Sequence, residues 1–479
     1  MSEMDRHGIT RALAVAWQAI RFDAHEGNDN LLAACKGSHG RLLPVAVQCL
    51  ARFDAMRDTF DTLKGRGFAA AAVLPGFTGG SFQDYGFRAF AKDFEAAGMP
   101  LILGVDDRAG MSMGVQIAGA KSYPVLLRWT GRGGYTLTSD LIAMARDYPN
   151  VMFDVASATQ SGAIELLADR IGASRLFIGT GCPENYASCG WFLLRAAELP
   201  PESRAAIAGG NLARVLGLTG HFGLPESSQW QRLTEMPKID THWHTSGWNM
   251  LEPRIDFEDL SRSISAYNMR TIVTSSIRGL NDDIVAGNEE TAAFLDREPR
   301  ARGYVVINPL RPADSLQELA KRREDARFVG AKSIQDFYGL RLDAREYRPI
   351  LKALGELKDW PIMAHLPGMR KAAMENPEVQ FIAAHSTWRH RELADLPNVW
   401  FDIATSTSKP SETDIRDLID VVGIDRVLFS SDAQLMDPAF TLGKVADLNL
   451  SDSDLQMLCA GNALRAFPRL KPGSGAEPR

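Results

Sequence analysis

Asp240-Thr241-His242-Trp243-His244 ends the first of eight short apolar runs in the second half of this 479-residue chain. The runs are rich in Val, Ile, Phe and Ala and do not alternate with polar residues, which is typical of parallel strands buried on both faces. Longer stretches with helical patterns separate them, as in βα units. The runs lie at residues 238–242, 271–275, 304–309, 328–334, 362–365, 381–385, 399–403 and 427–431. Eight such units in about 235 residues predict a compact (β/α)8 TIM barrel.

The first half of the chain is similar to the second half. Gly27-Asn28 has a counterpart in Gly287-Asn288, and residues 210–214 (GNLAR) have one in residues 461–465 (GNALR). Between these, four further pairs follow in the same order: residues 68–77 and 328–337, 100–104 and 361–365, 149–154 and 397–402, and 175–179 and 426–430. We interpret this order as an internal duplication.

The duplication predicts an α/β chain with two tandem TIM-barrel-like domains. We expect them at residues 1–218 and 237–470. Residues 219–236 contain Gly, Pro and Ser at a density that suits a linker. Residues 471–479 have the composition of a disordered tail.

Polar residues stand where several of the predicted strands end. His242 and His244 are two positions apart, so on a strand their side chains point to the same side. His365, His385 and Asp432 end the fifth, sixth and eighth runs. A single histidine at a strand end is more often structural, and HxH alone is a weak motif. Four histidines and an aspartate on one rim of a barrel predict a metal site, because imidazole suits zinc and other borderline divalent ions.

This arrangement resembles the amidohydrolase superfamily, and within it the amidohydrolase-2 branch that includes aminocarboxymuconate-semialdehyde decarboxylase. Gly330-Ala331-Lys332, Pro397-Asn398-Val399 and the closing Gly461-Asn462-Ala463 agree with it. The resemblance implies that four residues hold one divalent ion that activates water: His242, His244, His365 and Asp432. Zinc is the expected ion, although manganese, iron or cobalt would also fit.

The resemblance also implies roles beside the ion. Asp432 would take up a proton, and His385 would hydrogen-bond the water or polarise the substrate. Asp240 would orient a ligand or be structural. Lys332 lies where family members with two metals carry a carboxylated, bridging lysine. The alternative is an unmodified lysine that faces the site or a carboxylate.

The first half resembles the family in framework only. Gly104 takes the place of His365, and Gly181 that of Asp432. Ala72 replaces Lys332, and Arg128 or Trp129 replaces His385. The strand with DxHxH has no counterpart. We therefore expect a degenerate N-terminal barrel that lacks its first strand and metal ligands and that supports the second domain or shapes its pocket.

The metal site does not select the reaction. Arg370 and Arg389 follow the fifth and sixth strands and could bind a substrate carboxylate in bidentate fashion, or be solvated. Trp243 and Trp388 could wall a pocket for a planar substrate, or pack into the rim. We favour a metal-dependent hydrolase of a small carboxylate-bearing amide, ester or lactone. The alternatives are a non-oxidative decarboxylase of a small unsaturated or aromatic acid and a ligand-binding pseudoenzyme.

The composition agrees with a globular enzyme. Hydrophobic residues make up 45% of the chain and the net charge is −6, so we expect a small-molecule substrate and no nucleic-acid partner. We find no signal peptide and no apolar run that could span a membrane, and we expect a cytoplasmic protein. The two repeats should pack within one chain, and a homo-oligomer is compatible with the sequence.

Overall fold

The computed structural model describes residues 2–220 and 222–471. Residues 472–479 of the expected disordered tail therefore lie outside the described part of the chain. Contacts divide the chain into two compact units. Unit 1 comprises Met1–Ala158, Gly162–Thr180 and Leu193–Ser227, and unit 2 comprises Thr159–Ser161, Gly181–Phe192 and Ser228–Arg479. This division gives unit 2 two short segments from the first half of the chain, which the expected boundaries assign to the first domain.

Unit 2 is an eight-stranded parallel barrel, and each strand lies within or overlaps a run that the sequence predicts. Its strands follow one another in chain order: β8 (Lys238–Thr245), β9 (Met269–Ser276), β10 (Ala301–Val306), β11 (Phe328–Ser333), β12 (Ile362–Ala364), β13 (Phe381–Ala383), β14 (Val399–Asp402) and β15 (Val427–Leu428). Side chains from these strands, including Tyr304, Val329 and Met363, pack into one buried cluster with Phe467.

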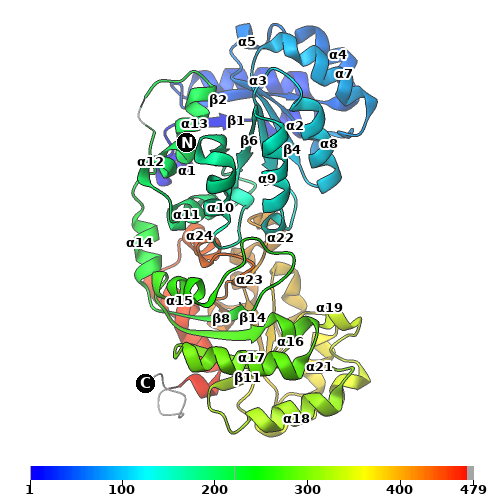
Figure 1. Ribbon diagram of the computed structural model, residues 1–479, viewed down its shortest axis with the longest axis vertical. Coiled ribbons are helices and arrows are strands. Elements are labelled where there is room, and N and C mark those ends of the chain that lie inside the picture. Colours follow the sequence, from blue (N-terminus) through cyan, green and yellow to red (C-terminus); the bar gives the residue numbers. More distant parts are fainter. Residues whose placement is uncertain (1, 221, 472–479) are drawn as a thin grey trace. The chain divides into compact units, whose positions relative to one another are not determined.

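Helices alternate with the strands of unit 2 (Figure 1). They are α14 (Ser228–Glu235), α15 (Phe257–Ala266), α16 (Ile277–Asn281), α17 (Ile284–Arg297), α18 (Pro312–Arg322), α19 (Gln335–Tyr338), α20 (Arg348–Leu357), α21 (Met369–Glu375), α22 (Pro410–Thr413), α23 (Ile415–Val422), α24 (Pro438–Leu448), α25 (Asp452–Gln456) and α26 (Asn462–Ala466). α14 lies within the expected linker. It is ordered because Leu233 is buried and the Lys238 ammonium donates to the carbonyls of Leu233 and Met236, each at 2.5 Å.

The barrel is closed between β8 and the segment that follows β15. The Thr241 amide donates to the Phe429 carbonyl at 3.1 Å, and the Asp432 amide donates to the His242 carbonyl at 2.8 Å. Trp243 and Ala433 form a parallel bridge. This closure brings β8, which carries His242 and His244, beside the segment that carries Asp432.

Unit 1 holds a seven-stranded parallel sheet, also in chain order. Its strands are β1 (Ala12–Ala14), β2 (Leu42–Gln48), β3 (Ala70–Val73), β4 (Leu101–Val105), β5 (Val125–Trp129), β6 (Val151–Asp154) and β7 (Leu176–Phe177). Its principal helices are α2 (Trp17–Arg21), α3 (Ala24–Lys36), α7 (Tyr85–Asp93), α8 (Arg108–Ala118), α9 (Thr138–Asp147), α10 (Ala163–Leu167), α12 (Pro201–Ala205) and α13 (Asn211–Val215). Among the described residues no strand pairing joins β1 to β7, so this sheet is an open, incomplete barrel.

Equivalent side chains hold the two sheets in the same way. Asn28 pairs with both backbone groups of Val47 on β2, at 3.0 and 2.9 Å. Asn288 pairs with both backbone groups of Val306 on β10, at 3.1 and 2.8 Å. β2 therefore matches the third strand of the barrel, and β1 matches the second. The missing strand of unit 1 is the counterpart of β8, as the sequence predicts.

Replacing Asn288 by alanine should lower the free energy of unfolding of unit 2 by about 2 kcal/mol, because the buried N–H and C=O of Val306 lose their partner. Asn30→Ala is the control, since the Asn30 side chain is bonded only at the exposed surface of α3, and it should change stability by less than about 0.5 kcal/mol. Urea unfolding followed by fluorescence measures both variants. Equal losses in the two would contradict this role of Asn288.

Candidate metal centre

The two histidines of β8 are buried side by side at the centre of the site. Exposure of His242 is 1% and that of His244 is 3%, and their ring centroids are 5.2 Å apart. Nδ1 of His242 lies 2.6 Å from Oδ2 of Asp402, and Nδ1 of His244 lies 3.3 Å from Oγ of Ser275. A carboxylate on Nδ1 favours the tautomer that carries its proton there. His242 is therefore held with the lone pair of Nε2 directed into the site.

Asp432 and His385 complete a group of possible ligands. Oδ1 of Asp432 lies 3.3 Å from Nε2 of His242 and 3.2 Å from Nε2 of His244. One ligand atom from each of His242, His385 and Asp432 lies within 4.8 Å of the others. Both His385 (φ 55°) and Asp432 (φ 62°) adopt the left-handed backbone region, which non-glycine residues rarely occupy outside functional sites.

The protonation states of these groups suit a divalent ion. Burial, together with the charge of Lys332, lowers the pKa of His244 to about 4 and that of His242 well below its ordinary value. Burial alone would raise the pKa of Asp432, but the imidazoles of His242 and His244 outweigh it and lower that pKa. Metal ligands must be deprotonated, and the directions of these pKa shifts agree with that requirement.

Lys332 lies within the same cluster. Its Nζ is 2.6 Å from Nε2 of His242 and 3.2 Å from Nε2 of His244, and its exposure is 1%. Burial lowers the pKa of this amine to about 8. The structure thus places Lys332 against the predicted ligands, where both the bridging role and an unmodified ammonium facing the site remain open.

His365 lies next to the cluster rather than within it. It follows β12 directly, and Gln335 pairs with its backbone amide and carbonyl at 2.9 and 2.8 Å. Its Nδ1 is 2.6 Å from Oδ2 of Asp336, and its ring centroid is 5.1 Å from that of His385. The close group therefore contains His385, whereas the expected ligand set has His365 in that place.

Asp240 joins the two strands that close the barrel. Oδ1 accepts from the amides of His242 and Ser431, both at 3.1 Å, and Oδ2 accepts from the Ser431 hydroxyl at 2.6 Å. Burial raises the pKa of Asp240 to about 7. Its contacts orient the backbone that carries His242, which agrees with the expected orienting role.

The four predicted substrate contacts are placed differently from one another. Trp243 has no exposed surface and lies on the opposite side of β8 from His242 and His244, a placement that fits packing within the barrel, the alternative to walling a pocket. Arg370 is held by both oxygens of Asp395, at 2.7 and 2.8 Å. Trp388 is half-buried beneath the guanidinium of Arg389, which lies 5.6 Å from its ring centroid. In the part of the chain that the structure describes, Trp388 and Arg389 keep exposed surface and make no contact with a carboxylate.

Sequence reasoning missed Asp402 and Asp336. Both follow the strand-end pattern that pointed to the histidines, since Asp402 ends β14 and Asp336 follows β11. Applying the same rule to every run would have found Asp402. Its pairing with His242 spans 160 positions and has no local signal.

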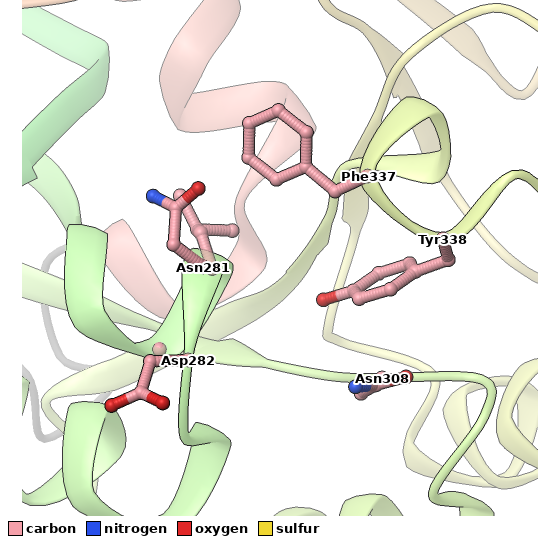
Figure 2. A pocket seen from close by; sticks show the side chains of 7 residues that line it. Asn281, Asp282, Asn308, Phe337 and Tyr338 are labelled. Carbon is pink, nitrogen blue, oxygen red and sulfur yellow. The ribbon is translucent and has the colours of Figure 1, made fainter. Parts of the chain in front are cut away.

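A separate cavity of about 390 Å³ opens at the carboxyl ends of β9, β10 and β11. Figure 2 shows Asn281 and Asp282 on one side of it and Phe337 and Tyr338 on the other, with Asn308 below. These ends form the rim of the barrel on which Lys332 and the histidines also lie. The cavity has room for part of a small molecule.

An α/β barrel with histidine and aspartate side chains converging at the carboxyl ends of its strands defines the class of TIM-barrel enzymes that use a divalent metal. The sequence profile of the amidohydrolase family matches residues 239–469. In the structure this match covers the barrel of unit 2.

The solved structures that match this chain align over about half of its length and over nearly all of their own. One is 5-carboxyvanillate decarboxylase from Novosphingobium aromaticivorans, with manganese, at 15% identity, a TM-score of 0.41 and coverage of 49% of this chain and 97% of that one. Another is 2,6-dihydroxybenzoate decarboxylase from Rhizobium, at 18% identity, a TM-score of 0.40 and coverage of 49% and 99%. A TIM-barrel protein of unknown function from Bordetella bronchiseptica matches at 12% identity, a TM-score of 0.40 and the same coverage. No curated protein matches the sequence. No helix of the described residues combines the length and apolar character needed to cross a membrane.

Asp402→Asn should weaken divalent-metal binding about 10- to 100-fold, because the amide no longer fixes the tautomer and basicity of His242. Competition against a chromophoric chelator measures the affinity. Asp420→Asn, at an exposed position of α23, is the matched control and should leave it unchanged. Equal affinities in both variants would show that Asp402 does not act through His242.

Proposed function

We propose that unit 2 is a metal-dependent hydrolase that acts on a small carboxylate-bearing amide, ester or lactone. The observation that supports this most directly is the convergence of His242, His385 and Asp432, with ligand atoms within 4.8 Å of one another at the mouth of the barrel. The match of residues 239–469 to the profile of the amidohydrolase family agrees with it.

In this proposal one divalent ion is held by Asp432 and the imidazoles around it. His242 and His244 present neutral Nε2 atoms to Asp432, and His385 or His365 supplies the remaining imidazole. Zinc is the ion that this donor set favours. A bound ion would polarise the scissile carbonyl and lower the pKa of water.

The remaining chemistry falls to side chains of this chain. Asp432 is ionised and accepts the proton that water gives up. The leaving group takes its proton back from Asp432, and His365, whose Nδ1 bonds Asp336, would accept a hydrogen bond from the substrate at Nε2. Asp402 and Asp240 do not touch the substrate; they hold His242 and its strand.

The cavity beside the site suits the distal part of the substrate. Asn281, Asn308 and Tyr338 line it with amides and a hydroxyl, which match the polar groups of a small acid derivative. Trp388 and Arg389 stay in the proposal as a second contact surface on the rim. Trp243 and Arg370 leave it, because the first is buried and the second is bound to Asp395.

Decarboxylation is the second candidate, and one observation favours it. Lys332 is a cation placed among the ligands themselves, 2.6 Å from His242, while Arg370 is paired elsewhere. A substrate carboxylate would therefore be drawn to the reacting centre rather than to a distant anchor. That is the placement a decarboxylase needs.

We also propose that unit 1 is a degenerate copy of the barrel and performs no metal chemistry. The equivalent pairings of Asn28 and Asn288 support a shared origin. Arg128, one of the two residues expected in the place of His385 beside Trp129, forms an ion pair with the buried Asp154, at 3.6 Å. The described part of unit 1 thus holds a charge pair near the place that His385 takes in unit 2.

Elemental analysis of protein purified without added metal should find about one divalent ion per chain, and His242→Ala should lose it together with at least about 10³-fold of the activity. His25→Ala in unit 1 is the control and should keep both. About two ions per chain would point instead to a bridging, carboxylated Lys332. No ion, with full activity, would exclude the metal mechanism.

Product analysis on a panel of small carboxylate-bearing amides, esters, lactones and aromatic acids separates the candidates. A hydrolase should release a new acid with no carbon dioxide, because water adds across the carbonyl. Carbon dioxide release would identify the decarboxylase. Tight binding with no turnover of any compound would favour the pseudoenzyme.

A further inference from the structure

Unit 2 includes a three-residue segment, Thr159–Ser161, that comes from the first half of the chain. We call it the 159–161 segment. It lies against two loops of unit 2. One follows β8, the strand of His242 and His244, and the other precedes α24 and follows Asp432.

Gln160 binds the loop that follows β8 through both atoms of its amide. Its Nε2 donates to the Pro253 carbonyl at 2.6 Å, and its Oε1 accepts from the Glu252 amide at 3.1 Å. Its exposure is 2%. One side chain thus satisfies a backbone donor and a backbone acceptor of the same loop, as a neighbouring strand would.

The two neighbours of Gln160 bind Asp437, the N-cap of α24. The Thr159 carbonyl accepts from the Asp437 amide at 2.7 Å, and the Ser161 hydroxyl donates to Oδ2 of Asp437 at 2.8 Å. Asp437 lies five positions after Asp432. The 159–161 segment therefore ties together the loops that leave the first and eighth strands.

A second segment from the first half acts on the adjoining loop. The Tyr186 amide donates to the Ser408 carbonyl at 2.8 Å, and the Ile415 amide donates to the Tyr186 hydroxyl at 3.2 Å. Ser188 binds Asp447 of α24 through its amide and its hydroxyl, at 3.0 and 2.7 Å. Residues 181–192 thus hold the loop after β14 and the helix after β15.

We propose that the 159–161 segment sets the substrate-binding geometry of unit 2, and that Gln160 is its positioning residue. Loops at the carboxyl ends of barrel strands select the substrate, and here short segments from the first half of the chain hold three of them. The ligand side chains themselves are held by other groups, such as Asp402 and Asp240, so Gln160 acts on substrate binding and not on metal binding. This inference rests on the proposed hydrolase function.

The test compares Gln160→Ala with Gln83→Ala, at an exposed position of unit 1, in the full-length protein. Hydrogen exchange of residues 246–256 should become about tenfold faster in Gln160→Ala, above all at the Glu252 amide, which loses its acceptor. KM should rise roughly tenfold with kcat within about twofold and with an unchanged metal content. Gln160→Glu keeps the acceptor for Glu252 and should lie between the parent and Gln160→Ala.

Unchanged exchange in Gln160→Ala would overturn the inference, as would faster exchange with KM unaltered. Loss of the metal would also overturn it, because Gln160 would then act on the ligands. Should Gln160→Ala fail to fold, the same measurements on Gln160→Glu decide. Hydrogen exchange reports the loop contact whether or not the protein turns over a substrate. If the parent protein hydrolyses no compound, that result contradicts the proposed hydrolase function but leaves the exchange measurement valid.

Discussion

The pairing of β8 with the segment after β15 is the constraint on which the site depends. A parallel sheet with two free edges would leave backbone amides and carbonyls unpaired. Here the Asp432 amide binds the His242 carbonyl at 2.8 Å, and Asp240 binds the backbone of Ser431 at 3.1 Å. The bonds that close the barrel are thus made by the residues that carry the ligands or adjoin them. The same hydrogen bonds therefore close the barrel and bring the site residues together. The open sheet of unit 1 lacks the counterpart of β8 and, with it, these bonds.

Several ionisable side chains are buried close together around the histidines. Asp240, Asp402 and Asp432 are buried within one small region, where an unpaired charge is costly. Burial raises the pKa of Asp240 to about 7 and raises that of Asp402, while the neighbouring imidazoles lower that of Asp432. The ammonium groups of Lys332 and Lys444 lie nearby, and burial lowers the pKa of each to about 8. Lys444 is held by the hydroxyl of Thr405 at 2.7 Å. A divalent ion would add positive charge next to two amines whose pKa values burial already lowers.

The two halves of the chain are braced by equivalent side chains. Matching asparagines brace matching strands, which is what two copies of one framework would keep. The copy without ligands is free to change its loops. Two of those segments, 159–161 and 181–192, are part of the compact unit that contains the site. Degeneration of one site would then have left a scaffold whose loops serve the other.

The sequence by itself determined the strands of the barrel, the absent first strand of unit 1 and the facing pair His242 and His244. Each of these follows from local rules, namely buried apolar runs and the alternation of side chains along a strand. That alternation also implies that Trp243 turns away from the site. Composition suggested only a linker at residues 219–236, and the structure adds α14 within it, which the burial of Leu233 orders. Only the tertiary structure decided that Asp402 orients His242, that His385 rather than His365 stands closest to Asp432, and that Gln160 reaches Pro253. These contacts join residues 160 and 93 positions apart in the first and last cases, and no local pattern encodes which distant side chain will meet which backbone group once the barrel has closed.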